Sequence, residues 1–220
     1  MSRWTDSLRD NDARFAEFAR SLTATQWAQP SLCTEWTNHD VLAHLVLGYS
    51  SPVRSIAIAM VRHRGSFDRA NTDMTRTLAA HRRPDDLLDD FTTLTFEPRG
   101  IGRLFPRRLL LGDHVIHELD ITYALGGDSA IPTATVAAVL DTQVRIPNPF
   151  VPAAARARGL NLIATDTNWS SPADGPTVTG RAAHLASVLA GRLWALPRLT
   201  GDGVAVLTAR LRTAPEKPFA

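Results

Sequence analysis

The sequence is poor in several residue types, and each shortage excludes a class of protein. Cys33 is its one cysteine, so neither an internal disulfide nor a cysteine-rich metal site can form within the chain. Lys217 is its one lysine, and every other basic residue is an arginine. No apolar run is long enough to span a membrane, because the best candidate, residues 55–61, is short and lies between Arg54 and Arg62.

The rest of the composition is that of an ordinary globular protein. Of the 220 residues, 44% are hydrophobic and 21% are charged, which excludes disorder and simple repeats. The net charge is +2 and the arginines are scattered among acids, so we do not expect nucleic-acid binding. The charges of Arg3, Asp6 and Arg9 are atypical of a signal peptide, and we expect a cytoplasmic protein. The preference for arginine indicates a GC-rich bacterial genome.

Helical periodicity dominates the first 127 residues. Apolar residues recur at spacings of three and four, and Thr37 with Asp40 is typical of a helix start. The predicted helices cover residues 8–22, 37–61, 67–80 with a continuation at 85–94, and 104–125. Because the connections are short, this pattern predicts an antiparallel four-helix bundle that ends near Gly127.

The remaining chain changes character after residue 127. Residues 128–158 are predicted to be a helix, 134–145, followed by a proline-rich linker, 147–158. Residues 159–220 are predicted to be a small α+β domain with strands at 160–165 and 177–179, a turn region at 169–176, and helices at 182–193 and 203–211. The fold class is therefore mainly α with a small C-terminal α+β domain.

Polar residues interrupt two apolar helix faces. Asp113 and His117 lie one turn apart on a stripe that also carries Leu110 and Ile121, and His44 lies beside Val41 on the second predicted helix. A buried carboxylate is costly unless it is paired or binds a cation. Two histidines and one carboxylate from two bundle helices can form a three-ligand metal site with an open position, which is the arrangement of a catalytic metal.

Spacing alone does not decide for a metal. A satisfied core histidine at position 44 and a helix-stabilising Asp113–His117 pair are the commoner explanation of such a pattern. His114 is a rival ligand, although we expect it on a flank of the helix near Glu118. The other histidines are predicted to lie at the surface or at helix ends: His39, His63, His81 and His184.

Three collinear segments resemble the mycothiol-dependent maleylpyruvate isomerase family. The first runs from Pro30 to Thr37 with the sequence PSLCTEWT and continues as DVLAHL at residues 40–45. The second is DHVIHELDI at residues 113–121, and the third comprises ATDT at 164–167, LAGR at 189–192 and LTGDGV at 199–204. The resemblance covers almost the whole chain and implies a DinB-like four-helix bundle with a small C-terminal domain.

The resemblance also implies a site and a reaction. Carried over by position, His44, Asp113 and His117 would bind a divalent metal, most often zinc, with Asp113 standing where the family has glutamate. The cofactor would be mycothiol, a small thiol of actinobacteria, and the reaction an isomerisation or S-conjugation of a small electrophile. Arg192 would bind a carboxylate and take part in catalysis, although an ordinary solvated arginine is the commoner case.

Three further residues have open roles. Trp36 is a candidate for lining the cofactor site, with a core role as the alternative, and Asp120 is a candidate support for the metal ligands. Cys33 is expected to be a small buried residue without a catalytic role. Two other functions stay open: a non-catalytic small-molecule-binding or regulatory module, and a metal-dependent hydrolase that uses bound water. Whether the chain forms a homodimer is also open.

Overall fold

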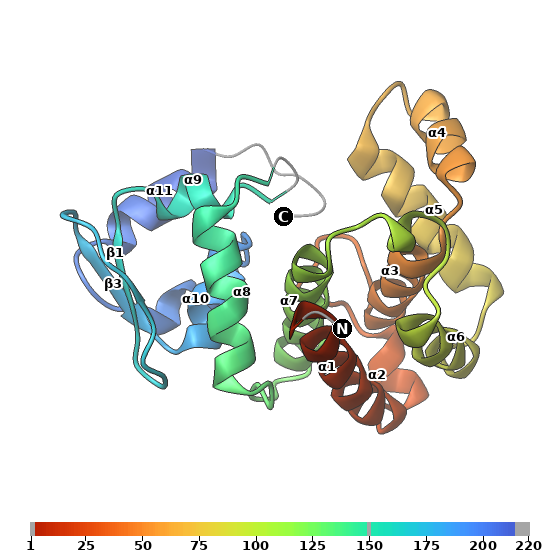
Figure 1. The fold of residues 1–220 in the computed structure, drawn as a ribbon, viewed down its shortest axis with the longest axis horizontal. Coiled ribbons are helices and arrows are strands. Elements are labelled where there is room, and N and C mark those ends of the chain that lie inside the picture. Colours follow the sequence, from red (N-terminus) through yellow and green to blue (C-terminus); the bar gives the residue numbers. More distant parts are fainter. Residues whose placement is uncertain (1–2, 149–150, 214–220) are drawn as a thin grey trace. The chain divides into compact units, whose positions relative to one another are not determined.

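The structure, a computed structural model, describes residues 3–148 and 151–213. The chain divides into two compact units, residues 1–127 and 128–220. The first is helical and the second combines helices with a small sheet (Figure 1), which confirms the predicted fold class. The helices of the first unit are α1 (Arg3–Arg20), α2 (Ala24–Ala28), α3 (Asn38–Ser50), α4 (Val53–Arg62), α5 (Phe67–His81), α6 (Pro84–Phe96), the 3₁₀ helix η1 (Gly100–Arg103) and α7 (Arg107–Ala124).

Four of these helices, α1, α3, α6 and α7, form the bundle. Helix α1 packs on α6 and α7, and α3 packs on the same two helices, while α5 covers another side of α3. The core between them contains fully buried Phe15, Leu45, Phe91 and Leu111. The rings of Phe15 and Phe91 meet edge to face with centroids 5.4 Å apart. This packing fixes which faces of α3 and α7 point inward.

The predicted single helix over residues 37–61 is wrong, because the chain forms two helices that are separated at Ser51 and Pro52. Helix α3 ends at Ser50 and α4 begins at Val53. Proline has no N–H and disfavours the helical conformation of the residue before it, and Ser51 is extended with φ −60° and ψ 124°. The chain after α6 then packs at the break, where Arg99 N donates to the Tyr49 carbonyl at 2.8 Å.

Two glycines permit this close approach. Ile101 N donates to the Ser51 carbonyl at 2.8 Å. A Cβ on Gly100 would lie 2.1 Å from the Ser51 carbonyl oxygen, and Gly100 has a φ of +49°. A Cβ on Gly102 would lie 2.6 Å from the Tyr49 carbonyl oxygen. The segment that leads into α7 can therefore donate hydrogen bonds to the carbonyl groups at the end of α3 only because positions 100 and 102 carry no side chain.

The second unit surrounds a three-stranded sheet with the strand order β2-β1-β3. Strand β1 pairs antiparallel with β2 and parallel with β3. Its elements are α8 (Thr133–Arg145), α9 (Ala153–Ala157), β1 (Asn161–Ala164), β2 (Ser170–Ser171), β3 (Thr177–Gly180), α10 (Ala182–Leu189), the 3₁₀ helix η2 (Leu193–Arg198) and α11 (Val204–Thr213). Strand β2 lies where a turn region is predicted, and α10 ends four residues before the predicted end, with Gly191 at φ +109°.

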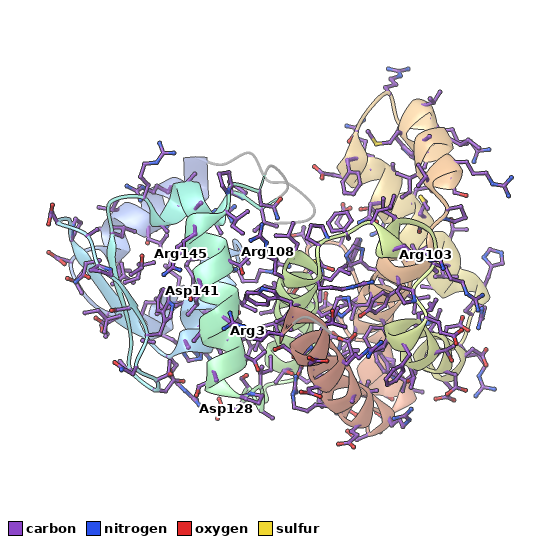
Figure 2. All side chains as sticks on the ribbon, in the orientation of Figure 1. Arg3, Arg103, Arg108, Asp128, Asp141 and Arg145 are labelled. Atoms are coloured by element: carbon purple, nitrogen blue, oxygen red, sulfur yellow. The ribbon has the colours of Figure 1, made fainter. Side chains whose placement is uncertain are left out.

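Residues 128–158 pack within the second unit. Helix α8 packs on α10 and α9. Figure 2 shows Asp141 and Arg145 along α8; their side chains form an ion pair at 3.3 Å, and Trp169 Nε1 donates to Asp141 at 3.2 Å. Helices α2 and α9 lie in segments predicted to be irregular, and residues 149–150 of the predicted linker lie outside the described residues. None of the described helices combines the length and apolar character that a membrane span requires.

Candidate metal centre

His44 takes its position from the start of α3. The Thr37 hydroxyl accepts a hydrogen bond from Asp40 N at 3.1 Å, and the Asp40 carboxylate accepts one from Thr37 N at 2.8 Å. This reciprocal cap fixes the first turn, as the sequence predicts. Val41 and Leu45 are then fully buried in the bundle, which places the imidazole of His44, between them in sequence, at the edge of the core.

Asp113 and His117 reach the same point from α7. His44 Nε2 lies 3.5 Å from Asp113 Oδ2, and His117 Nε2 lies 3.5 Å from Asp113 Oδ1. The two imidazole rings are 4.8 Å apart at their centroids. Side-chain exposure is 14% for His44, 5% for His117 and 39% for Asp113. The histidines are thus buried or nearly so, while the carboxylate is partly exposed.

These side chains lie close enough together to bind one metal ion. His44 Nε2 and His117 Nε2 each lie 3.5 Å from a different oxygen of the Asp113 carboxylate. One donor atom of each of the three residues lies within 4.8 Å of the others. Two imidazoles and one carboxylate are also a donor set that zinc accepts while keeping a fourth position open. The residues present therefore fit a divalent metal.

The pKa values of His44, His117 and Asp113 are shifted in different directions. Burial is the largest influence on each histidine and disfavours its protonated form. In His44 burial prevails and lowers the pKa, whereas in His117 the carboxylate of Asp113 and hydrogen bonds to Asp113 and Asp120 outweigh burial and raise the pKa well above its usual value. Burial raises the pKa of Asp113, but His117 and His44 together lower it well below its usual value. Without metal, His117 and Asp113 thus form an ion pair at neutral pH, beside a neutral His44.

Each histidine has a second partner on its other ring nitrogen. Nδ1 of His117 lies 3.1 Å from Asp120 Oδ2, and the Asp120 side chain is buried. Nδ1 of His44 lies 3.2 Å from the side-chain nitrogen of Asn71 on α5. Asp120 thus occupies the supporting position for which the sequence makes it a candidate, whereas nothing in the sequence pattern pointed to Asn71.

Trp36 and Cys33 enclose the histidines from the loop before α3. The ring of Trp36 is buried, stacks on His117 with centroids 6.0 Å apart, and lies 5.0 Å from the ring of His44. Cys33 is buried and contacts His117. The donor atoms of Cys33, His117 and Asp120 also lie within 4.8 Å of one another. His117 belongs to both groups, with Nε2 toward Asp113 and Nδ1 toward Asp120, which is the arrangement of a ligand and its supporting partner.

The structure adds detail to other predicted positions. His114 lies near Glu118 as expected, but it is buried, and its Nδ1 lies 2.7 Å from Asp12 Oδ1. His184 lies in the first turn of α10, at a helix end as predicted, and is buried. Arg192 belongs to the second unit and is not solvated, since it is 4% exposed and its guanidinium donates to the Ala190 carbonyl at 3.1 Å. The first unit alone brings together His44, Asp113, His117 and Trp36.

Comparisons with known proteins bear on the first unit and on the fold. Residues 8–96 match the family model of the mycothiol maleylpyruvate isomerase N-terminal domain. A crystal structure of the mycothiol-dependent maleylpyruvate isomerase is similar with a TM-score of 0.53 at 16% identity, and one of its histidine-to-alanine mutants with 0.55 at 15%. Both similarities cover 90% of this chain and 91% of the other. No curated protein matches significantly. Residues 8–96 are thus similar to the mycothiol maleylpyruvate isomerase N-terminal domain, and the chain shares the fold of that isomerase.

Proposed function

We propose that the protein is a metal-dependent enzyme that uses a low-molecular-weight thiol, such as mycothiol, to isomerise or S-conjugate a small electrophilic substrate. The observation that supports this most is the clustering of His44, Asp113 and His117, whose donor atoms lie within 4.8 Å of one another, as three ligands of one divalent ion require. Zinc is the metal that this donor set favours. A cytoplasmic location, where such thiols are available, is part of the proposal.

The chemistry divides between the metal and the chain. When bound, a divalent metal lowers the pKa of a coordinating thiol, which makes the thiolate available as a nucleophile. His44 and His117 would hold the ion from two helices, and Asp113 would neutralise part of its charge at the partly exposed side. Trp36 covers the two imidazoles and excludes water from that side of the centre. Addition of the thiolate to a conjugated double bond, rotation and elimination give isomerisation, and loss of a leaving group gives S-conjugation.

Arg192 is proposed to bind a carboxylate of the cofactor or substrate. Arg192 and Arg156 both belong to the second unit. Burial is the larger cause that lowers the pKa of Arg156, and the positive charge of Arg192 lowers it further. Two buried positive charges of this kind favour an anion beside them. The carboxylate of a maleylpyruvate-like substrate is such an anion.

The first test is metal content. Purified wild type loaded with zinc should retain about one ion per chain, and His117→Ala should lose it because one of three ligands is gone. His81→Ala is the matched control, since His81 is exposed and its Nδ1 contacts the Thr77 carbonyl. If the wild type binds no divalent metal under any loading condition, the enzyme proposal fails and the binding-module alternative replaces it.

The second test is thiol dependence. Zinc-loaded wild type is incubated with mycothiol and a panel of electrophiles, and adducts or isomers are followed by mass and absorbance. Turnover that needs the thiol and is lost in His117→Ala supports the proposal. Turnover that proceeds equally without thiol indicates the hydrolase alternative, in which bound water is the nucleophile.

A further inference from the structure

The contact between Asn71 and His44 constrains where the proton of His44 resides. The amide nitrogen of Asn71 lies 3.2 Å from His44 Nδ1. An NH₂ group can only donate, so in this contact Nδ1 accepts, and a neutral imidazole then carries its proton on Nε2. That nitrogen faces Asp113 Oδ2 at 3.5 Å.

This tautomer is the opposite of the one that a metal requires. A metal at the Asp113 side of His44 needs the lone pair of Nε2, which moves the proton to Nδ1. Nδ1–H and the Asn71 NH₂ would then be two donors facing each other. A half-turn of the amide exchanges its oxygen and nitrogen, so that Oδ1 accepts from Nδ1–H at the same place.

We infer that Asn71 is a positioning residue whose amide orientation is coupled to metal binding. It donates to His44 Nδ1 in the metal-free protein and accepts from it when the metal is held. The inference rests on the proposed metal centre. It assigns to His44 the same kind of outer partner that Asp120 provides for His117, at 3.1 Å from Nδ1.

The surrounding helix supports a fixed position for this amide. Helix α5 begins at Ser66, whose hydroxyl accepts from Arg69 N, and it packs along α3. Ala70, Thr72 and Thr75 are buried on α5, so the register of the helix against α3 is set by packing. Asn71 is partly exposed, which leaves its amide room to turn.

Two substitutions of Asn71 test whether its side chain must accept a hydrogen bond from His44 Nδ1 when the metal is bound. Asn71→Leu keeps a similar volume and removes both functions, so the zinc affinity should fall 10- to 100-fold, roughly the cost of losing an outer partner of a ligating histidine. Asn71→Asp can only accept when ionised, so it favours the metal-binding tautomer, and its zinc affinity should equal or exceed that of the wild type. Asn161→Leu is the matched control, because Asn161 is also part-buried and its amide donates to Thr177 Oγ1 in the second unit.

Zinc affinity is measured on full-length proteins by competition with a chromogenic chelator, and thermal melts of the metal-free forms show that each variant folds. Long-range ¹H–¹⁵N spectra of the His44 ring give its tautomer, which should change from Nε2–H to Nδ1–H on zinc loading. Equal affinities of Asn71→Leu and wild type overturn the inference and leave the metal centre standing. So does an equal loss in both Asn71 variants, or Nδ1–H already present without zinc. A wild type that binds no zinc overturns both proposals.

Discussion

A single carboxylate joins the four bundle helices behind the metal centre, and its removal is the most informative test of how the first unit is held together. Asp12 on α1 accepts hydrogen bonds from Tyr49 on α3 and from Thr95 on α6 at 3.1 Å, and lies 2.7 Å from His114 Nδ1 on α7. Asp12 is 1% exposed and His114 2%. Burial and the charge of Asp12 raise the pKa of Tyr49, so this hydroxyl stays a donor at all accessible pH values.

The expected loss in the free energy of unfolding depends on which buried polar groups each substitution leaves without a hydrogen-bond partner. Tyr49→Phe removes one donor to a charged acceptor that keeps two others, which should lower the free energy of unfolding by about 2 kcal/mol. That loss corresponds to a fall in Tm of roughly 4–8 °C for a chain of this size. Asp12→Ala leaves Tyr49 and His114 buried without this acceptor, whereas Thr95 keeps the Phe91 carbonyl at 3.0 Å, and it should cost about 3–5 kcal/mol.

A pair of threonines provides the matched control. Thr95→Val removes a donor to Asp12, whereas Thr75→Val removes a buried hydroxyl that has no hydrogen-bond partner among the described residues. Urea unfolding followed by far-UV circular dichroism should show a loss of about 1–2 kcal/mol for Thr95→Val. Thr75→Val should be neutral or slightly stabilising. If Tyr49→Phe costs less than about 0.5 kcal/mol, or if both valine variants cost the same, Asp12 does not act as the common acceptor.

Two predictions concern the metal ligands directly. Asp120→Asn keeps an acceptor near His117 Nδ1 but removes its charge, so zinc affinity measured by chelator competition should fall roughly 10-fold with an unchanged circular dichroism spectrum; an unchanged affinity would contradict a supporting role for the carboxylate. Zinc affinity should rise with pH and then level off above the raised pKa of His117, because the proton held there by Asp113 must leave before the nitrogen can bind. The stability of the metal-free protein should change with pH in the opposite direction. The contribution of His117 to the free energy of unfolding is fully present below the ordinary histidine pKa and is lost as the pH rises through the raised pKa of the folded protein. A zinc affinity that does not change with pH would refute the ion pair.

The periodic parts of the fold were predictable because they follow local rules. Thr37 and Asp40 identify the start of α3, and apolar spacing identifies the bundle helices. The break at Pro52 was missed although the residue is visible in the sequence. Apolar periodicity continues through Val53 to Val61 and outweighed a proline signal that should have ended the helix. The short elements α2 and β2 contain too few residues to give a period at all.

The candidate site was predictable only in its ligands. His44, Asp113 and His117 stand out because polar groups on an apolar stripe are anomalous within a single helix. Asn71 lies on another helix, and its relation to His44 depends on how α5 packs against α3, which no local pattern states. The partner of His114 is hidden for a related reason: Asp12 lies 102 residues earlier, and a buried pair formed from two distant helices cannot be seen from either one.

Helices α3 and α7 each carry one side chain that contacts Asp12 and at least one candidate metal ligand. On α7, Asp113 faces the candidate centre while the next residue, His114, turns into the core toward Asp12; on α3, His44 and Tyr49 do the same five residues apart. A shift of α3 against α7 would therefore disturb the Asp12 contacts together with the spacing of the metal donors. The buried polar network thus holds the donors at their spacing in the metal-free protein, so that binding need not order the helices first. In that arrangement the proton on His117 and the tautomer of His44 are what remain to change when a metal is held, and both changes involve side chains rather than the backbone.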